Sequence, residues 1–323
     1  MWYLLISAGF IGFSNHAYKI RKIAEMSGRV KTEVIFHPKK KLDHVKATNK
    51  LEDLKKCDVI FILSPNHTHF QYLEYFSLDY SGYIYCEKPP TTSIEDLNKL
   101  SRLPLDHSKV FFNFQERFGN LRKILEKSLK DGSIGDPLSC SILSTQGLAF
   151  KENYAQSWRS DIKLHPHGVA ETKAIHFIDL LSILFGNPKD YSYLPTNRSG
   201  NGTAADHCNF SLTFENNLTA NLVMSYAAPL AFEFSLLGTN GLLEYRNNCI
   251  SVRTPRDTFD DKGYFITPPI RIEAEETEKE RTQRPLELSL EYFLSHVESN
   301  HKLPKELFEQ SLDSNRFILN LKL

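Results

Sequence analysis

The sequence lacks an excess of charge of either sign. Its 39 Lys and Arg residues balance 39 Asp and Glu residues over 323 positions, so no net field would draw the chain onto nucleic acid or anionic lipid. A run of about 18 apolar residues is also absent, which argues against a membrane-spanning helix. No basic leader precedes the first apolar segment, and we expect a cytoplasmic protein that binds neither nucleic acid nor membranes.

Cysteine is scarce and scattered. The five cysteines form no Cys-x-x-Cys pair, so we expect buried reduced thiols rather than a disulfide framework or a zinc site. The pairs His67-Thr68-His69 and His165-Pro166-His167 have no acidic or cysteine partner at ligand spacing, and no metal is expected there. With 41% hydrophobic and 24% charged residues the composition is that of a globular protein, and the length predicts two domains.

The first 116 residues alternate short β-branched runs with helical patterns, which is typical of a parallel sheet with crossover helices. Strands are predicted at 2–7, 32–36, 59–64, 83–87 and 109–114. Helices are predicted at 17–26, 51–56, 69–76 and 94–100. We therefore expect residues 1–116 to form a doubly wound, dinucleotide-binding Rossmann domain.

After residue 116 the pattern changes. Helices are predicted at 120–129, 169–185, 286–297 and 305–321. Alternating strands with short connections are predicted at 209–214, 218–224, 231–237 and 242–246. Residues 253–284 are charged and proline-rich, which predicts a surface excursion. Residues 117–323 should thus form an α+β domain with an open, mostly antiparallel sheet, and the whole chain an α/β protein.

A glycine-containing segment lies where a dinucleotide fold places its phosphate-binding turn. Gly9 would allow the backbone to approach a pyrophosphate, Gly12 would allow close packing of helix on strand, and Ser7 replaces the first glycine of the usual fingerprint. The residues expected to contact the coenzyme here are Ala8, Gly9, Phe10, Ile11 and Gly12. An ordinary strand–helix turn is the alternative.

The end of the second predicted strand carries cations instead of the acidic residue that binds the ribose hydroxyls of NAD. His37-Pro38 is followed by three lysines, and His37, Lys39 and Lys40 could pair with a 2′-phosphate. NADP is therefore slightly favoured over NAD, while a solvated basic turn is an equally good interpretation.

Two further motifs follow predicted strands, at the sheet edge where open α/β folds bind ligands. Ser64-Pro65-Asn66-His67-Thr68-His69 follows one strand, and Cys86-Glu87-Lys88-Pro89-Pro90 follows the next. The tandem prolines fix the direction of the chain, which would hold Lys88 on a stiff strand end as an acid–base or orienting group must be held. A surface lysine is the alternative.

The second domain contributes a histidine on a helix. His176 and Asp179 share one face at i and i+3 among apolar neighbours, and Trp158-Arg159-Ser160-Asp161 precedes this helix. An imidazole with an ordinary pKa of about 6.5 can serve as general acid or base near neutrality. A structural histidine bonded to Asp179 is the alternative.

Together these segments resemble the family of glucose-fructose oxidoreductase, inositol dehydrogenase and MocA. The resemblance covers nearly the whole chain and rests on the motifs above together with Asn113, Arg117 and Ile134-Gly135-Asp136-Pro137. It implies an N-terminal dinucleotide domain and a C-terminal domain whose open sheet forms a homodimer or homotetramer. It also implies hydride transfer between NAD or NADP and a carbon of a sugar or nucleotide sugar, for example in surface-glycan synthesis.

The resemblance assigns roles to individual residues. Lys88 would bind the reacting oxygen and His176 would be the principal acid–base group, so these two are the candidate catalytic residues. The candidate substrate-binding residues are Lys88, Trp158, Arg159, Thr172 and Asp179. The candidate coenzyme residues beyond the glycine segment are His37, Lys39, Lys40, Ser64, Pro65, Asn66, His69, Glu87 and Lys88.

Two departures from the family pattern bear on activity. Thr172 stands four residues before His176, where many members carry an aspartate, and His165-Pro166-His167-Gly168 replaces the usual glycine run. Without that carboxylate the imidazolium loses about 1 kcal/mol or more of stabilisation. The substrate, Glu171 or Asp179 would then supply the charge, or catalysis is weak. A coenzyme-binding regulator without turnover, and a reductase of a non-sugar ligand such as a linear tetrapyrrole, are the alternative functions.

Overall fold

The computed structural model describes residues 5–38 and 46–322, which form two compact units. The first unit comprises the chain up to Phe114 together with Glu287–Asn320, and the second comprises Gln115–Leu286 with the last residues of the chain. The predicted division at 116/117 assigns all later residues to the second domain. The C-terminal helices instead pack with the first unit, because their apolar side chains are buried against its sheet.

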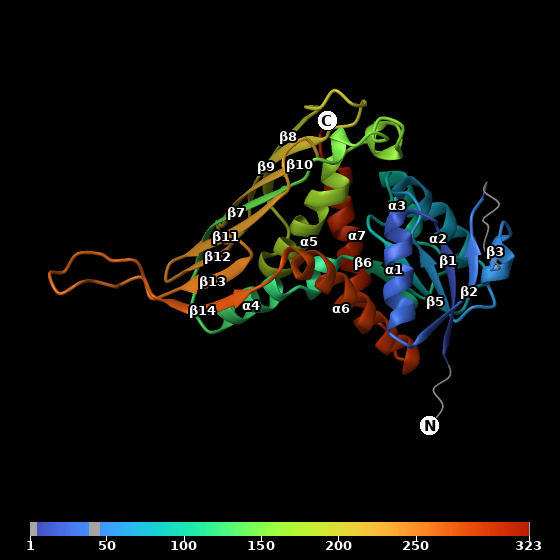
Figure 1. The fold of residues 1–323 in the computed structure, drawn as a ribbon, viewed down its shortest axis with the longest axis horizontal. Helices are drawn as coiled ribbons and strands as arrows, with labels where there is room; N and C mark the ends of the chain where they lie inside the picture. The colour runs from blue at the N-terminus through green and yellow to red at the C-terminus, as the bar shows by residue number, and fades with distance from the viewer. Residues whose placement is uncertain (1–4, 39–45, 323) are drawn as a thin grey trace. The chain divides into compact units, whose positions relative to one another are not determined.

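The first unit is built on a parallel sheet of six strands in the order β3-β2-β1-β4-β5-β6. The strands are β1 (Ile6–Ile11), β2 (Val30–Phe36), β3 (Ala47–Thr48), β4 (Val59–Ile62), β5 (Tyr83–Glu87) and β6 (Val110–Asn113). The chain winds from β1 outward through β2 and β3 and then crosses to β4 on the other side of β1 (Figure 1). This reversal is the switch point of a doubly wound sheet, and the predicted Rossmann fold is confirmed.

Helices pack on this sheet through apolar faces. They are α1 (Asn15–Met26), α2 (His69–Ser77), α3 (Ile94–Leu100), the C-terminal part of α6 (Glu278–Glu298) and α7 (Lys305–Leu319). In α1 the buried residues Ala17, Ile20 and Ala24 are spaced three and four apart, as one helix face requires. The helix predicted at 51–56 is a single 3₁₀ turn, Leu51–Leu54.

Phe293 holds the C-terminal helices to the first sheet. Its ring centre lies 6.1 Å from that of Phe61, 5.3 Å from that of Tyr85 and 5.6 Å from that of Phe111. Phe293 is fully buried by these contacts with β4, β5 and β6. Such an aromatic cluster contributes several kcal/mol of apolar burial, and the local sequence pattern does not show which sheet receives it.

The second unit is an eight-stranded sheet covered by helices. The strand order is β14-β13-β12-β11-β7-β10-β9-β8, and every neighbouring pair is antiparallel except β7 and β10. The strands are β7 (Pro137–Thr145), β8 (Asp190–Thr196), β9 (His207–Thr213), β10 (Thr219–Ser225), β11 (Ala231–Gly238), β12 (Leu242–Arg246), β13 (Cys249–Arg253) and β14 (Ile270–Glu275). The helices are α4 (Asn120–Lys130) and α5 (Ile175–Phe185). Phe177 of α5 stacks on Phe232 of the sheet with ring centres 5.6 Å apart. The predicted α+β unit with a mostly antiparallel sheet is confirmed.

Four strands of this sheet, β7, β8, β13 and β14, lie outside the predicted ranges. β7 lies in the middle of the sheet. Its residues alternate between polar and apolar, but it contains many serines and few β-branched or aromatic residues, which weakens the strand signal. β14 lies inside the predicted surface excursion 253–284 and pairs with β13. Within residues 253–284, the hairpin between β13 and β14 projects from the sheet (Figure 1). A β-bridge between Phe259 and Phe265 joins the two arms of this hairpin.

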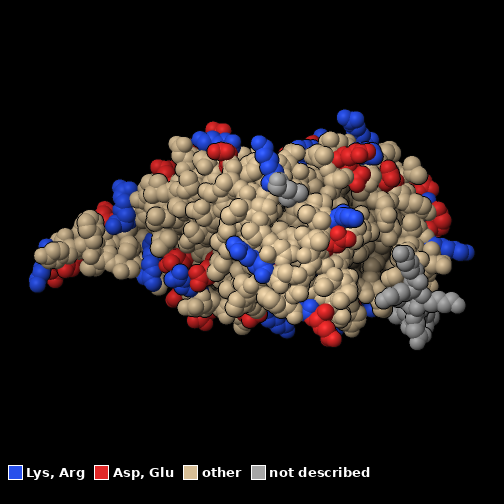
Figure 2. All heavy atoms as spheres, turned by 90° about the horizontal axis from the view of Figure 1, so that it is seen from above, with Lys and Arg blue, Asp and Glu red and all other residues tan. Residues whose placement is uncertain are grey.

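The remaining surface and thiol predictions can be compared directly with the structure. All five cysteines are free thiols and four of them are buried, as predicted. No helix within residues 5–38 and 46–322 is long and apolar enough to cross a membrane. Basic and acidic side chains are interspersed on the face seen in Figure 2, which agrees with the balanced composition.

Candidate coenzyme site and acid–base residues

The first strand ends in a tight turn at Gly12. β1 runs to Ile11, Gly12 adopts φ +114°, and the Oγ of Ser14 caps α1 by accepting from the backbone N–H of Ala17 at 3.3 Å. A Cβ on Gly12 would lie 2.6 Å from the carbonyl oxygen of Leu63, just beyond the end of β4. Glycine is therefore required both by the backbone angle and by the close approach of the chain. The start of α1 provides the N–H groups with which such a turn binds a pyrophosphate.

The turn lies further along the chain than the sequence predicted. Gly9 is inside β1, and a Cβ there would lie 3.0 Å from the side chain of Leu54. Residues 8–11 are thus strand residues, of which Phe10 lines the pocket described next. The segment 12–17, with the pattern Gly-x-Ser-x-x-Ala, occupies the place of the glycine fingerprint.

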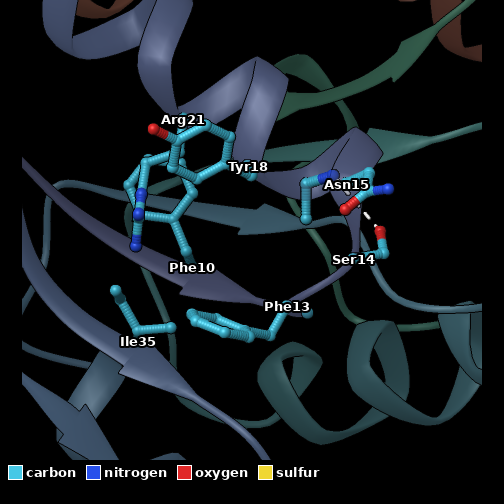
Figure 3. Close-up of a pocket in the computed structure, with 9 residues that line it drawn as sticks. Phe10, Phe13, Ser14, Asn15, Tyr18, Arg21 and Ile35 are labelled. Atoms are coloured by element: carbon cyan, nitrogen blue, oxygen red, sulfur yellow. Dashed lines mark hydrogen bonds between the residues drawn. The ribbon is translucent and has the colours of Figure 1, made fainter. Parts of the chain in front are cut away.

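A pocket adjoins this turn between α1 and β2. Its walls are mostly apolar and aromatic, and the described residues that line it include an arginine and no carboxylate. They are Phe10, Gly12, Phe13, Ser14, Asn15, Ala17, Tyr18, Arg21 and Ile35 (Figure 3). Aromatic walls with a few polar groups suit a nucleoside, because they bury the base and orient its polar edges.

Of the residues after β2 that were predicted to bind the coenzyme, the structure describes His37. The backbone N–H of His37 donates to the carbonyl oxygen of Thr48 in β3 at 3.1 Å, and the His37 side chain is half-buried. Lys39 and Lys40, the other two residues predicted to hold a 2′-phosphate, lie outside the described residues.

A buried histidine ties the segment after β4 to the segment after β5. His69 is fully buried, with Nδ1 2.8 Å from the carbonyl oxygen of Pro89 and Nε2 2.9 Å from that of Ser64. Burial lowers the pKa of His69, although the two carbonyl groups oppose the shift, so the ring is neutral at pH 7. His69 is therefore a positioning residue.

Asn66 presents an amide at the same edge. The residue is 7% exposed, and its buried Nδ2 has no hydrogen-bond acceptor within the described residues. A buried amide donor without an acceptor costs about 1–3 kcal/mol, so a ligand or water is expected to accept from it. Pro65 and Ser64 form the preceding turn, and the hydroxyl of Thr68 donates to that of Ser64 at 2.7 Å.

β5 ends in a buried carboxylate followed by a lysine. The Oε1 of Glu87 accepts from Nδ2 of Asn113 at 2.7 Å and lies 3.3 Å from Nε2 of His16 in α1. Burial opposes ionisation of Glu87, but His16, Lys88 and the Asn113 amide together lower its pKa, so it is a carboxylate at neutral pH. Lys88 comes next, half-buried, and a cis peptide bond joins it to Pro89. Glu87 thereby fixes the strand end that carries Lys88.

Gly12, Asn66 and Lys88 follow three neighbouring strands, β1, β4 and β5. The carboxyl ends of parallel strands meet at one sheet edge, so these three predicted coenzyme residues follow strands that end at the same edge.

In the second unit, the helix with the candidate histidine begins irregularly. A π-helical turn, Ala170–Ala174, precedes α5, and such turns are frequent at functional sites. Thr172 lies in this turn, and the half-buried His176 lies in the first turn of α5.

Tyr226 is a residue of this region that the sequence analysis missed. It follows β10, is 3% exposed, and its hydroxyl is hydrogen-bonded to that of Thr172. Burial raises the pKa of Tyr226, while Arg159 and Thr172 oppose the shift, so the phenol is protonated at neutral pH. No local sequence signal links Tyr226 to a helix 54 residues earlier.

The predicted Trp158 and Arg159 belong to the same region. The Arg159 guanidinium lies 4.3 Å from the ring centre of Trp158. The ring centres of Trp158 and His165 are 5.1 Å apart, and their planes are inclined at 72°. His165 and Glu171 are fully buried, with Nε2 and Oε2 3.9 Å apart. The Oε1 of Glu171 accepts the backbone N–H of His167 at 2.7 Å. The Glu171 side chain thus holds the loop before the π-helical turn.

Asp179 is engaged in a buried ion pair. Its two carboxylate oxygens accept from Nε and a terminal nitrogen of Arg117 at 2.7 and 2.6 Å, and neither side chain is more than 1% exposed. The pair anchors α5 to the 3₁₀ turn Gln115–Phe118. Because Asp179 has no exposed surface, its geometry fits a positioning role better than the predicted substrate contact.

A parallel sheet with this glycine turn, joined in one chain to a mostly antiparallel sheet, defines a two-domain, NAD-binding class of oxidoreductase. The chain belongs to the GFO/IDH/MocA family. Residues 6–114 match the oxidoreductase family's NAD-binding Rossmann fold, and residues 123–244 match the GFO/IDH/MocA C-terminal domain. No curated protein sequence matches the chain.

Solved structures share the fold over almost the whole chain. A levoglucosan dehydrogenase, in complex with NADH and levoglucosan, is 16% identical with a TM-score of 0.79, covering 98% of this chain and 97% of its own. Myo-inositol 2-dehydrogenase from Lactobacillus plantarum is 17% identical with a TM-score of 0.76, covering 98% and 95%. An oxidoreductase from Agrobacterium radiobacter, in complex with NAD+, L-tartaric acid and magnesium, is 14% identical with a TM-score of 0.78, covering 98% and 94%.

Proposed function

We propose that the chain is an NAD(P)-dependent oxidoreductase that transfers a hydride between nicotinamide and a carbon of a sugar or nucleotide sugar, as in surface-glycan synthesis. The convergence of Gly12, Asn66 and Lys88 at the switch-point edge of the first sheet carries this proposal. The sugar-like substrate class is supported by the similarity to levoglucosan and inositol dehydrogenases.

Lys88 and His176 are assigned complementary roles. The bound coenzyme would supply the acceptor or donor of the hydride. In the direction of oxidation, Lys88 would hold the reacting hydroxyl oxygen while His176 takes its proton. The carbon loses a hydride, the oxygen loses a proton, and the product is a carbonyl compound. In the direction of reduction, protonated His176 would return the proton to the oxygen.

Thr172 modifies this scheme, because it presents a neutral hydroxyl, hydrogen-bonded to Tyr226, at the position where many members of the family carry an aspartate. The imidazolium of His176 then has less stabilisation, so we expect proton transfer to rely on charge supplied by the substrate. The same observation favours a second candidate function, a coenzyme-binding regulator that has lost turnover.

Coenzyme binding and turnover test the proposal. NADH and NADPH are titrated against the protein by fluorescence, and sugars and nucleotide sugars are screened through the absorbance of the reduced nicotinamide. Lys88→Ala and His176→Ala should each lower kcat about 10²–10⁴-fold. Lys99→Ala and His301→Ala, at exposed positions, are the matched controls.

The outcomes separate the candidates. Turnover in Lys88→Ala and His176→Ala within threefold of the parent contradicts the assigned roles. Tight binding of reduced coenzyme without turnover on any substrate favours the regulator. No binding of either coenzyme contradicts both.

We further propose that the open face of the second sheet forms a homodimer or homotetramer. Ser141, Ser211 and Asn221 on neighbouring strands are exposed, whereas the alternate residues Ile142 and Leu212 are buried. Small polar side chains of this kind can pack closely across a self-complementary interface. Light scattering should give a multiple of the chain mass, and Ser141→Arg should lower it; a monomeric parent contradicts this arrangement.

A further inference from the structure

We propose that Arg21 binds the 2′-phosphate of NADP and makes the pocket between α1 and β2 selective for NADP over NAD. The inference rests on the proposed function, because it requires the adenosine half of a coenzyme to bind beside Gly12. Arg21 belongs to none of the motifs recognised in the sequence.

Arg21 is a cation with an unusual lack of partners. Its guanidinium carbon lies 5.5 Å from the ring centre of Tyr18, one turn earlier on α1. Its buried Nε has no hydrogen-bond acceptor, and no carboxylate pairs with the guanidinium, among the residues that the structure describes. In Figure 3 the Arg21 nitrogens extend beside Tyr18 toward the Ile35 side of the pocket. A half-buried guanidinium in this position favours an anionic ligand.

The nearest acidic residue on the helix is engaged elsewhere. Glu25 stands at i+4 from Arg21, the spacing at which the two would normally form an ion pair. Its Oε1 instead accepts from the hydroxyl of Thr32 in β2 at 2.6 Å. Arg122, which has Glu126 at the same spacing, does form such a pair, at 2.7 Å. The α1 arginine thus keeps its charge available to the pocket.

Among the described residues, the pocket offers no carboxylate of the kind that binds NAD. Selectivity for NAD depends on a carboxylate that accepts from the ribose hydroxyls, and none of the described lining residues is acidic. β2 is followed by His37. A carboxylate would repel a 2′-phosphate, whereas a planar guanidinium can donate two parallel hydrogen bonds to its oxygens.

The test compares Arg21→Met with Lys22→Met, which removes one positive charge from an exposed position of the same helix. Dissociation constants for NADPH and NADH are measured by fluorescence, and those for 2′,5′-ADP and 5′-AMP by calorimetry. We expect the parent to bind NADPH at least tenfold more tightly than NADH. In Arg21→Met the dissociation constants of NADPH and 2′,5′-ADP should rise tenfold or more, while those of NADH and 5′-AMP stay within twofold of the parent values. In Lys22→Met all four dissociation constants should stay within about twofold of the parent values.

Retained NADH binding shows that Arg21→Met is folded. The assignment of Arg21 is overturned if Arg21→Met loses affinity for NADPH and NADH equally, or if its dissociation constant for NADPH is unchanged. Equal affinity of the parent for the two coenzymes overturns the selectivity while leaving the proposed oxidoreductase intact. Failure of the parent to bind either coenzyme instead overturns the proposed function on which this inference rests.

Discussion

At the scale of single residues, two glycines of the first unit show why the same residue type carries different information. Gly12 and Gly28 both have positive φ, at +114° and +71°. A Cβ on Gly12 would meet the backbone of Leu63 at 2.6 Å, whereas a Cβ on Gly28 would meet nothing within 4 Å. Gly12 is therefore required both by tertiary packing and by its backbone conformation, whereas Gly28 is required by its backbone conformation alone.

Gly12→Ala should lower the free energy of unfolding by about 3 kcal/mol or more, because backbone strain adds to a clash with main-chain atoms. Gly28→Ala, the matched control, should cost only about 1 kcal/mol. Urea unfolding measures both changes. Equal costs for the two variants would show that the approach of Gly12 to Leu63 is unimportant for stability.

Residues whose position depends on contacts between distant parts of the chain could not be predicted from local sequence patterns. Lys88 was placed well because β5 ends where predicted and tandem prolines terminate it. The glycine turn was misplaced because Gly9 is explained by the Leu54 side chain packed against it, a contact between distant residues. Tyr226 could not be found, because a hydroxyl–hydroxyl contact leaves no pattern in the chain.

At the scale of elements, the π-helical turn and the loop before it are the least regular part of the second unit. His167 in this loop is 6% exposed, and burial lowers its pKa to about 4. The unfolded chain binds a proton near the ordinary pKa of about 6.5, so between these values the unfolded state holds more protons than the folded state. Stability is therefore expected to fall as the pH drops through this interval.

His167→Gln should remove part of this pH dependence. Between pH 7 and pH 4.5 the parent should lose about 2–3 kcal/mol more stability than the variant, because only the parent must keep a buried imidazole neutral. Denaturant unfolding at the two pH values gives the difference. His301→Gln, at an exposed position, should behave like the parent. An identical loss in His167→Gln and the parent would contradict the expected role of His167.

Elements were predicted best where their faces are regular. The parallel strands β4 and β5 are continuous apolar runs and were found, whereas β7, with serines and threonines on its open face, was not. The alternation expected of a strand with one solvated face is present in β7, but its many serines and few β-branched or aromatic residues give it a low strand propensity.

At the scale of the whole molecule, the first unit is assembled from both ends of the described chain, and Phe293 is one of the residues that join the C-terminal segment to it. Phe293→Ala should lower the stability of this unit by about 3–5 kcal/mol. Retention of NADPH binding in increasing urea reports on the first unit and should be lost earlier in this variant.

Phe234→Ala is the matched control, since Phe234 is similarly buried, 2% exposed against 0% for Phe293, but lies in the second unit. It should destabilise that unit and shift the loss of NADPH binding less. Equal shifts in the two variants would show that the units unfold as one cooperative body.

Residues 115–286 of the second unit lie between the two chain segments that form the first unit. This order affects folding during synthesis. A ribosome releases Phe293 only after residues 115–286 of the second unit have been synthesised. Until then the aromatic rings of β4, β5 and β6 lack the side chain that covers them, so the nascent Rossmann sheet remains incomplete while the later-encoded sheet can already close. The N-terminal domain, although translated first, is therefore expected to be the last to reach its native state and the one most dependent on chaperones during synthesis.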